Sequence, residues 1–198
     1  MPDPLNPLRI VRVVAWGLIA ALSAVMLYVT LSSEKPAGVA IGGPFTLTAM
    51  DGKRLNTAEV MRGRPYGVFF GFTHCPDICP TAMWELSEIL RKSGPMAKDF
   101  RVFFVTVDPE RDTPELLSSY ISAFDNRIIG MSGTAEEIAA VARAHRAFYR
   151  KVPTPSGYTM DHTATIYLFD GKAQLWGTFD ATESEENRLK KLARLLGK

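Results

Sequence analysis

The chain has 198 residues, a length typical of one domain, of which 46% are hydrophobic and 22% are charged. This composition excludes a disordered, collagen-like or coiled-coil protein, and the net charge of +2 excludes the strongly basic surface typical of nucleic-acid-binding proteins. Two cysteines are too few for a small scaffold held by disulfides. A chain of this length can bury a hydrophobic core without disulfides, so we expect the cysteines to have another role.

The first feature along the chain is an uncharged apolar segment, Val13–Leu31. As a helix it would be roughly 28 Å long, close to the thickness of the hydrocarbon core of a bilayer. Arg9 and Arg12 precede it, and aromatic residues, which favour the membrane interface, lie near its ends. The positive-inside rule therefore places residues 1–12 in the cytoplasm and exports everything that follows the segment.

A cleaved signal peptide is the alternative, because it also has basic residues before an apolar stretch. Its apolar core is usually about 7–15 residues long and is followed by a small-x-small cleavage site, whereas Ala21-x-Ser23 lies inside the apolar segment. The N-terminus also lacks the Arg- and Ser-rich amphipathic character of an organelle transit peptide. We expect an uncleaved single-span anchor in a bacterial inner membrane, with a periplasmic domain in which cysteines can be redox-active.

Residues 32–43 have the composition of a short tether, and residues 44–198 have the patterns of a globular domain. An Asp-Gly turn at Asp51-Gly52 predicts a hairpin that begins near Phe45. Downstream, apolar runs predict strands and amphipathic spacing predicts helices. Strands are expected at Tyr66–Phe72, Arg101–Val107, near Ile128-Ile129, at Thr163–Phe169 and at Ala173–Phe179, and helices at Thr81–Lys92, from Thr113 to about Phe124, from Ser132 or Thr134 to about Phe148, and at Ser184–Leu196.

The order of these elements predicts an α/β fold. Strands linked by helices come first, and a hairpin and a closing helix come last, which is typical of a thioredoxin-like sandwich with a central mixed sheet flanked by helices. We expect Trp84 to lie in the core of this sandwich. We expect His145 to lie on the solvated surface, because Arg143 and Arg146 are close to it in the sequence.

The residues best suited to redox chemistry or metal binding lie in one loop, GFTHCPDICPT, between an expected strand and an expected helix. Cys75 and Cys79 lie at the entry to a helix N-terminus, whose positive dipole end favours thiolate, and thiolate is both the nucleophile and the metal ligand. The redox loop of thioredoxins is C-x-x-C, whereas the spacing here is C-x-x-x-C. The added residue widens the turn and can direct both sulfurs toward one point outside it. That arrangement suits a shared metal, and a disulfide between the two cysteines is the alternative.

A third ligand is expected, because two thiolates rarely complete a metal site. His74 is adjacent to Cys75, and adjacent side chains point apart in an extended chain. His162 lies directly before a predicted strand, in the loop that faces the cysteine loop in thioredoxin-like folds and usually presents a cis-proline there. Here that loop offers Asp161 and His162, so we expect His162 to be a ligand. Met160 would point the same way as His162 only if the segment is extended.

Three motifs in order, GFTHCPDICPT, TVDPERDTPE (Thr106–Glu115) and YTMDHTATIYLFD (Tyr158–Asp170), together with the N-terminal apolar segment, resemble the Sco (SenC) family of membrane-anchored copper proteins. The resemblance implies a thioredoxin fold and one copper ion, Cu(I) or Cu(II), bound per chain by Cys75, Cys79 and His162. It also implies a metallochaperone that delivers copper to the binuclear copper centre of cytochrome c oxidase subunit II, or a reductant of that subunit's cysteines. A periplasmic copper donor and a thiol reductant would be its further partners.

The chemistry of these ligands agrees with copper. Two soft thiolates and an imidazole suit Cu(I), and the same ligands with a weak oxygen suit Cu(II), whereas zinc would usually take a fourth ligand. Cycling of Cys75 and Cys79 between dithiol and disulfide would link metal release to electron transfer. Asp77 and Asp161 are candidates for groups that orient His162 or tune the cysteines.

Three functions remain open on the sequence alone. Copper delivery requires Cys75, Cys79 and His162 together, whereas a thiol–disulfide reductase acting on subunit II or another periplasmic partner would not need the histidine. A peroxidase of similar fold is the third, although the loop lacks the Pro-x-x-x-Thr-x-x-Cys arrangement of peroxiredoxins. The acidic loop Asp108–Asp112 is either a solvated helix cap or a segment that shapes the surface around the cysteines.

Overall fold

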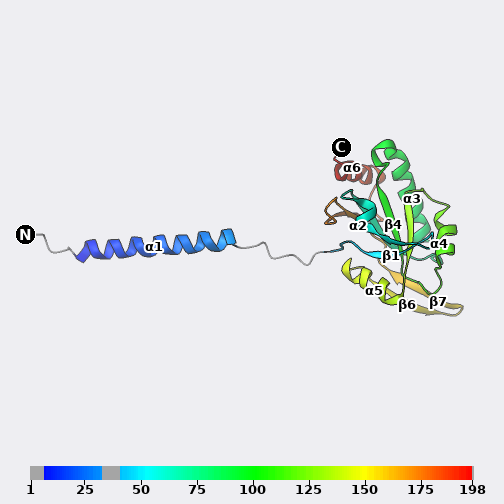
Figure 1. Cartoon of the computed structure of the whole chain (residues 1–198), viewed down its shortest axis with the longest axis horizontal. Coiled ribbons are helices and arrows are strands. Elements are labelled where there is room, and N and C mark those ends of the chain that lie inside the picture. Colours follow the sequence, from blue (N-terminus) through cyan, green and yellow to red (C-terminus); the bar gives the residue numbers. More distant parts are fainter. Residues whose placement is uncertain (1–6, 33–40, 198) are drawn as a thin grey trace, which may run out of the picture. The chain divides into compact units, whose positions relative to one another are not determined.

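The computed structural model describes residues 7–32 and 41–197 of the chain. These residues form two units, an N-terminal helix and a domain of strands and helices (Figure 1). The domain contains the cysteine loop and all three histidines, so the candidate site is built within it.

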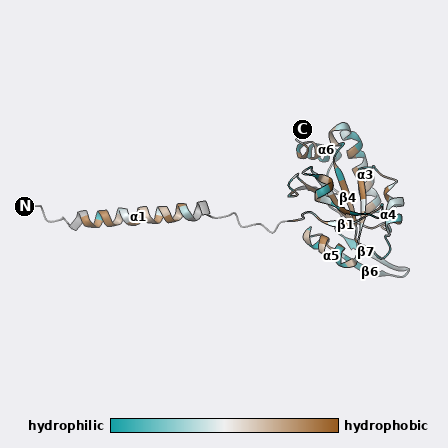
Figure 2. Cartoon of the chain, in the orientation of Figure 1, coloured by the Kyte–Doolittle hydropathy of each residue, from teal (hydrophilic) through white to brown (hydrophobic). Residues whose placement is uncertain are grey.

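The N-terminal helix, α1 (Pro7–Ser32), contains the whole apolar segment predicted at Val13–Leu31. Of the described helices, only this one is long and apolar enough to cross a membrane, over Ile10–Tyr28. Hydrophobic residues recur along this helix (Figure 2), and the large apolar side chains between Ile10 and Tyr28 are exposed, which is typical of a membrane span. Residues 1–6 of the predicted cytoplasmic segment, and most of the tether predicted at 32–43, lie outside the described residues.

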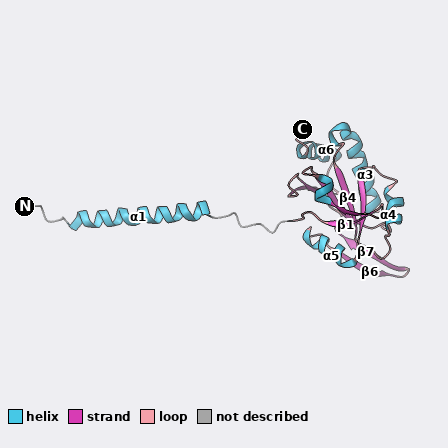
Figure 3. Ribbon diagram, viewed as in Figure 1, coloured by secondary structure: helices cyan, strands magenta, loops and turns pink. Residues whose placement is uncertain are grey.

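The described domain is built on one mixed sheet (Figure 3). Its strands are β1 (Thr46–Ala49), β2 (Arg54–Asn56), β3 (Tyr66–Gly71), β4 (Arg101–Thr106), β5 (Ile128–Ser132), β8 (Ile166–Phe169) and β9 (Leu175–Phe179), in the spatial order β2-β1-β5-β4-β3-β8-β9. The central strands β3, β4 and β5 are parallel, and the strands on either side of them are antiparallel to their neighbours. Every residue of β3 is buried, as expected for a central strand covered on both faces.

Helices cover the sheet. They are α2 (Thr57–Met61), α3 (Ile78–Ser93), a 3-10 turn (Gly94–Ala97), α4 (Pro114–Ile121), α5 (Ala135–Ala144) and α6 (Glu185–Leu195). Thr113 caps α4 as predicted, and of the two candidates Ser132 and Thr134 it is Thr134 that caps α5; the side-chain oxygen of each cap accepts a hydrogen bond from a backbone N–H group of the first turn. α4 packs closely against β5 at Gly130, where a Cβ atom would lie only 3.2 Å from Leu117. The predicted α/β sandwich with a mixed sheet is therefore confirmed.

The cysteine loop enters α3 earlier than predicted. The helix begins at Ile78 rather than at Thr81, because Pro80 is tolerated in a first helical turn, where its missing N–H would have no partner. Cys79 therefore belongs to the helix itself. The prediction for Trp84 is wrong: its side chain is 62% exposed, since Met83 and its helical neighbours form the buried face of α3.

A hairpin is present that the sequence analysis did not predict. β6 (Tyr149–Thr154) and β7 (Gly157–His162) lie where the end of a helix and a loop were expected, and α5 ends at Ala144. Pro153 within β6 obscures the strand pattern, because proline is rare inside sheets and is tolerated mainly in edge strands. His162 is therefore the last residue of a strand rather than part of a loop.

The surface position predicted for His145 is wrong. This residue follows α5 directly and is only 1% exposed. Its Nδ1 donates a hydrogen bond to the carbonyl oxygen of Val141 at 2.8 Å, and its Nε2 is buried without a hydrogen-bond partner among the described residues. The rings of Phe45, Phe70 and Phe169 meet it at centroid distances of 5.3 to 5.5 Å, roughly edge to face. The imidazole thus lies in an aromatic cluster of the core.

Helical spacing would have revealed this burial. Ile138, Val141 and Ala142 are the buried residues of α5, and His145 continues their i, i+3, i+4, i+7 pattern. Arg143 lies on a different face of the same turn, so its charge does not indicate where the side chain of His145 lies. The periodicity of the buried residues therefore predicts the position of His145 better than the polarity of its sequence neighbours does.

Burial makes stability depend on the protonation of His145. Loss of water around the ring lowers its pKa, against the opposing effect of the bond to Val141. The unfolded chain therefore binds this proton more readily than the folded one, and we expect the free energy of unfolding to fall as the pH drops from about 7 to about 5. H145F should show a smaller fall than the wild type in urea titrations. Equal falls in H145F and the wild type would contradict this assignment.

Candidate metal centre

The cysteine loop joins β3 to α3 at the carboxyl end of the central parallel strands. Phe72, which follows β3, is buried and anchors the start of the loop, and its carbonyl oxygen accepts a hydrogen bond from the N–H of Cys75 at 3.3 Å. Cys75 lies in the loop and is partly exposed, whereas Cys79 lies in the first turn of α3 and is fully buried. Both thiols are free. One sulfur is thus accessible to a partner, and the other is held inside.

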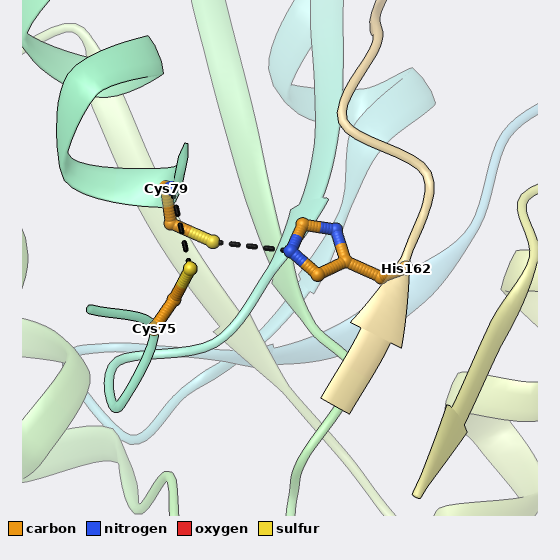
Figure 4. A group of neighbouring side chains, drawn as sticks. All are labelled: Cys75, Cys79 and His162. Carbon is orange, nitrogen blue, oxygen red and sulfur yellow. Dashed lines mark hydrogen bonds between the residues drawn. The ribbon is translucent and has the colours of Figure 1, made fainter. Parts of the chain in front are cut away.

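His162 approaches these thiols from the end of β7 (Figure 4). Its Nε2 lies 3.3 Å from the sulfur of Cys79. The ligand atoms of Cys75, Cys79 and His162 all lie within 4.8 Å of one another. The three residues predicted as metal ligands from positions far apart in the sequence therefore converge on one point.

The ring of His162 is oriented for ligation. Its Nδ1 lies 3.0 Å from the carbonyl oxygen of Thr163, which can only accept, so Nδ1 carries the proton of this hydrogen bond. In the neutral ring the lone pair is then on Nε2, which faces the sulfurs. Phe72 and Phe69 meet the ring edge to face at centroid distances of 5.7 and 6.1 Å. The fold thus selects both the tautomer and the direction of the imidazole.

The two thiols differ strongly in acidity. The hydrogen bond from the Cys79 side chain, assisted by the backbone N–H groups of Cys79 and Asp77, lowers the pKa of Cys75 far below its usual range. The same interaction with Cys75, together with burial, raises the pKa of Cys79. The pair therefore loses its first proton from Cys75 and retains the second on Cys79. A soft cation would meet a preformed thiolate at the accessible position.

This asymmetry predicts selective alkylation of the reduced, metal-free protein. At about pH 6, where an ordinary thiol is almost fully protonated, we expect iodoacetamide to modify Cys75 and to leave Cys79 unmodified. Peptide mapping by mass spectrometry reports the position. C79A should slow the reaction of Cys75, because the thiol that donates to it is lost. Preferential labelling of Cys79 would contradict the assignment.

The acidic loop Asp108–Asp112 holds the cysteine loop and is not merely a solvated helix cap. Asp112 is fully buried, and its carboxylate accepts hydrogen bonds from the backbone N–H of Thr73 at 3.0 Å and from the Thr73 hydroxyl at 2.6 Å. A third hydrogen bond comes from the Thr106 hydroxyl at 2.6 Å. These bonds fix the start of the cysteine loop against β4. Of the two interpretations of this loop, the contacts favour the one in which it shapes the surroundings of the cysteines, and the role of Asp112 itself had no signal beyond the motif TVDPERDTPE.

The other candidate residues surround the site without joining the cluster of ligands. Asp77 precedes α3, with its carboxylate 3.5 Å from the Thr81 hydroxyl, and Asp161 pairs with Arg150 across the β6–β7 hairpin at 3.2 Å. His74 points to Thr73, whose hydroxyl oxygen lies 3.0 Å from its Nδ1.

A pocket of about 230 Å³ opens beside the ligands. It is lined by residues of both ligand-bearing segments, among them Cys75, Asp77, Met160, Asp161 and His162. Met160 is thus placed beside the site, on the same side of β7 as the histidine, as the period of a strand requires. The pocket thus opens beside the partly exposed Cys75.

Comparison with known proteins places the chain in one family. The family model described as SCO1/SenC matches residues 33–197. The SCO2-like protein of Rickettsia felis is 34% identical over 182 residues, which are 85% of this chain and 87% of that protein. The human mitochondrial SCO1 homolog is 36% identical over 132 residues, which are 65% of this chain and 44% of that protein. The chain spans less than half the length of the human, mouse and Arabidopsis relatives.

A solved structure has the same fold. The structure of Bradyrhizobium japonicum ScoI with copper bound has a TM-score of 0.72 to this one and 44% sequence identity, and the match covers 79% of this chain and 99% of that chain. This similarity confirms the predicted thioredoxin-like sandwich. The family model, the full-length bacterial relative and the solved structure agree with the three sequence motifs, and the chain belongs to the SCO1/SenC family.

Proposed function

We propose that this protein binds one copper ion between Cys75, Cys79 and His162 and delivers it during assembly of cytochrome c oxidase. The observation that carries the proposal is the convergence of two sulfurs and one imidazole nitrogen within 4.8 Å. Two soft thiolates favour Cu(I), and the added imidazole also suits Cu(II). The copper-bound ScoI structure from Bradyrhizobium japonicum, at 44% identity, supports copper as the ion.

The site suits an ion that the protein transfers to a partner rather than one that it retains. Three protein ligands leave a coordination position open, and the partly exposed Cys75 lies at the pocket of about 230 Å³. A ligand of the receiving protein can enter there while Cys79 and His162 still hold the ion. The recipient in this proposal is the binuclear copper centre of oxidase subunit II, as the family resemblance implies.

Copper transfer is the experiment that tests this function. Full-length protein in detergent is loaded with one equivalent of copper, mixed with the metal-free copper-centre domain of subunit II, and separated by gel filtration. We expect copper to move to subunit II and its characteristic absorption to develop. A control with the C75S/C79S variant should transfer nothing beyond the level of free copper. Retention of copper by the wild type in the presence of metal-free subunit II would contradict the proposal.

A thiol–disulfide reductase is a second candidate, favoured by the different exposure of the two free thiols. The accessible Cys75 thiolate would attack a disulfide of the partner, and the buried Cys79 would then close the Cys75–Cys79 disulfide and release the partner as a dithiol. Two electrons pass from this protein to the partner. Oxidised subunit II treated with the reduced, copper-free protein should gain free thiols, and H162A should retain this activity.

Membrane anchoring is part of the proposal. The apolar stretch Ile10–Tyr28 of α1 would span the bacterial inner membrane once, with Arg9 and Arg12 on the cytoplasmic side and the domain in the periplasm. Such an anchor would keep the domain close to a membrane-bound oxidase. Protease added to spheroplasts should then digest the domain, and protection of the domain would contradict this topology.

Asp77 and Asp161 are proposed to tune the site from its rim. Both line the pocket beside Cys75 and His162, and the N–H of Asp77 contributes to the low pKa of Cys75. Asp161 is exposed and is paired with Arg150, so its effect would be electrostatic. An unchanged copper affinity and dissociation rate in D161N would exclude it.

A further inference from the structure

The hairpin that carries His162 is separate from the main sheet. Within the described part of the chain, β6 and β7 form hydrogen-bonded ladders only with each other. The cysteines, in contrast, follow a central strand of the main sheet and are fixed by it. The distance between the histidine and the sulfurs therefore depends on the short link of residues 163–165 to β8 and on contacts between the hairpin and the body of the domain.

A network of three residues around the buried carboxylate of Asp108 supplies such contacts. Asp108, which is only 2% exposed, accepts a hydrogen bond from the Tyr158 hydroxyl at 2.9 Å and another from Nε of Arg111. Arg111 also donates from Nη1 to the backbone carbonyl oxygen of Tyr158 at 3.1 Å. Its guanidinium carbon lies 3.9 Å from the centroid of the Tyr158 ring, an arrangement typical of cation–π stacking. Asp108 and Arg111 belong to the body of the domain, and Tyr158 belongs to β7.

This network lies close to His162, the proposed metal ligand. Tyr158 and His162 are four residues apart on β7, so their side chains leave the same side of the strand. The guanidinium of Arg111 also lies 5.9 Å from the centroid of the Phe72 ring, whose edge-to-face partner is His162. Nη2 of Arg111 is buried and has no hydrogen-bond partner among the described residues, so the stacked rings are its surroundings.

The loop between β4 and α4 therefore contacts both ligand-bearing segments. Asp112, near its end, binds Thr73 at the start of the cysteine loop, and Asp108 and Arg111 bind the hairpin. These contacts from one short loop define how far apart the two segments lie. The carboxylates of Asp108 and Asp112 are buried, and such contacts are strong only in the geometry that pairs all their groups.

We propose that Asp108, Arg111 and Tyr158 are positioning residues, which hold the β6–β7 hairpin so that His162 faces the two thiols before a metal ion arrives. The proposal rests on the copper site of the proposed function. Its physical basis is pre-organisation: a hairpin already in place does not have to be ordered when the ion binds, so less of the binding free energy is lost. Without the network, His162 would dissociate from the ion more often, and copper would be released faster.

Two variants and one matched control test this role. R111K keeps the positive charge but loses the bond to the Tyr158 carbonyl and the planar stack, and Y158F loses only the hydroxyl bond to Asp108. R127K is the control, because Arg127 forms a similarly short-range pair with Asp125, at 2.6 Å, but lies before β5 at the opposite end of the sheet. All are made in the full-length protein, and circular dichroism verifies that each is folded.

Copper release is the first readout. We expect R111K to accelerate the loss of Cu(II) to an excess of chelator about tenfold, as is typical for groups that orient a metal ligand, and to weaken the imidazole nitrogen coupling in the EPR spectrum. Y158F should also accelerate the release of copper and weaken the nitrogen coupling, but to a smaller extent. R127K should lower the melting temperature without changing the release of copper or the nitrogen coupling. If R111K behaves like R127K, the network has only a structural role and the proposal is overturned.

Hydrogen exchange in the copper-free protein separates this proposal from the proposed function. We expect R111K to speed amide exchange across β6 and β7 (149–162) while exchange in β3 and β4 stays at the wild-type rate. Faster exchange of the hairpin supports the positioning role even if the wild type bound no copper. Exchange in R111K at the wild-type rate contradicts it, even if the wild type binds copper tightly.

Discussion

H162A is expected to lower the affinity for Cu(II) by more than about a hundredfold, since removal of groups that merely orient a metal ligand already costs about 10- to 100-fold. His162 supplies the only nitrogen in the cluster of three ligands, and its Nε2 lies 3.3 Å from the sulfur of Cys79. Its loss leaves two thiolates, a donor set that suits Cu(I) much better than Cu(II). Competition titrations with chelators should therefore show a larger loss for Cu(II) than for Cu(I).

The matched control for this prediction is H74A. His74 lies in the cysteine loop beside Cys75 but turns its Nδ1 to the Thr73 hydroxyl, at 3.0 Å, rather than to the sulfurs. H74A should retain copper binding, with the thiolate-to-Cu(II) charge-transfer band of the wild type. Equal affinities of H162A and the wild type would remove His162 from the site and favour the thiol–disulfide reductase.

D112A is expected to lower the free energy of unfolding by about 2–4 kcal/mol, because the buried carboxylate accepts three hydrogen bonds and its removal leaves buried donors without partners. The change should also loosen the cysteine loop, since two of those donors belong to Thr73. Urea unfolding of the reduced, copper-free protein measures the first effect. The copper affinity of the folded D112A variant measures the loosening of the cysteine loop.

D51A serves as the control for D112A. The side chain of Asp51 is 58% exposed, and its carboxylate accepts a hydrogen bond from the N–H of Lys53 within a turn. Exposed substitutions of this kind usually change stability by about 0.5 kcal/mol or less. A loss of stability in D112A no larger than that in D51A would mean that the acidic loop does not hold the cysteine loop.

Much of the fold followed from local patterns. The continuous apolar runs of β3 and β4 predicted buried central strands, and Thr113 and Thr134 predicted helix starts, because capping depends on residues only three positions apart. The hairpin β6–β7 was missed, since Pro153 and the polar residues around it carry no period of two that a buried sheet would impose.

The cluster of Cys75, Cys79 and His162 was also predicted without coordinates, and its binding of a metal ion stays a prediction. Cys75 and Cys79 were identified by their spacing before a helix, and His162 by its place before a strand of the expected fold together with the family motifs. The acidity of the thiols was foreseen only in part. The helix N-terminus favours thiolate at both cysteines, whereas the contact between the two sulfurs and the burial of one of them separate their pKa values.

The sequence by itself determined the apolar N-terminal helix, the thioredoxin-like domain and the three candidate ligands, because each depends on periodicity or on short motifs. Only the tertiary structure revealed the residues that hold those ligands in place. Asp112 and Thr73 are 39 positions apart, and Asp108 and Tyr158 are 50 positions apart. A hydrogen bond between such residues leaves no local pattern in the chain, since chain folding alone brings the partners together and burial alone makes their pairing strong.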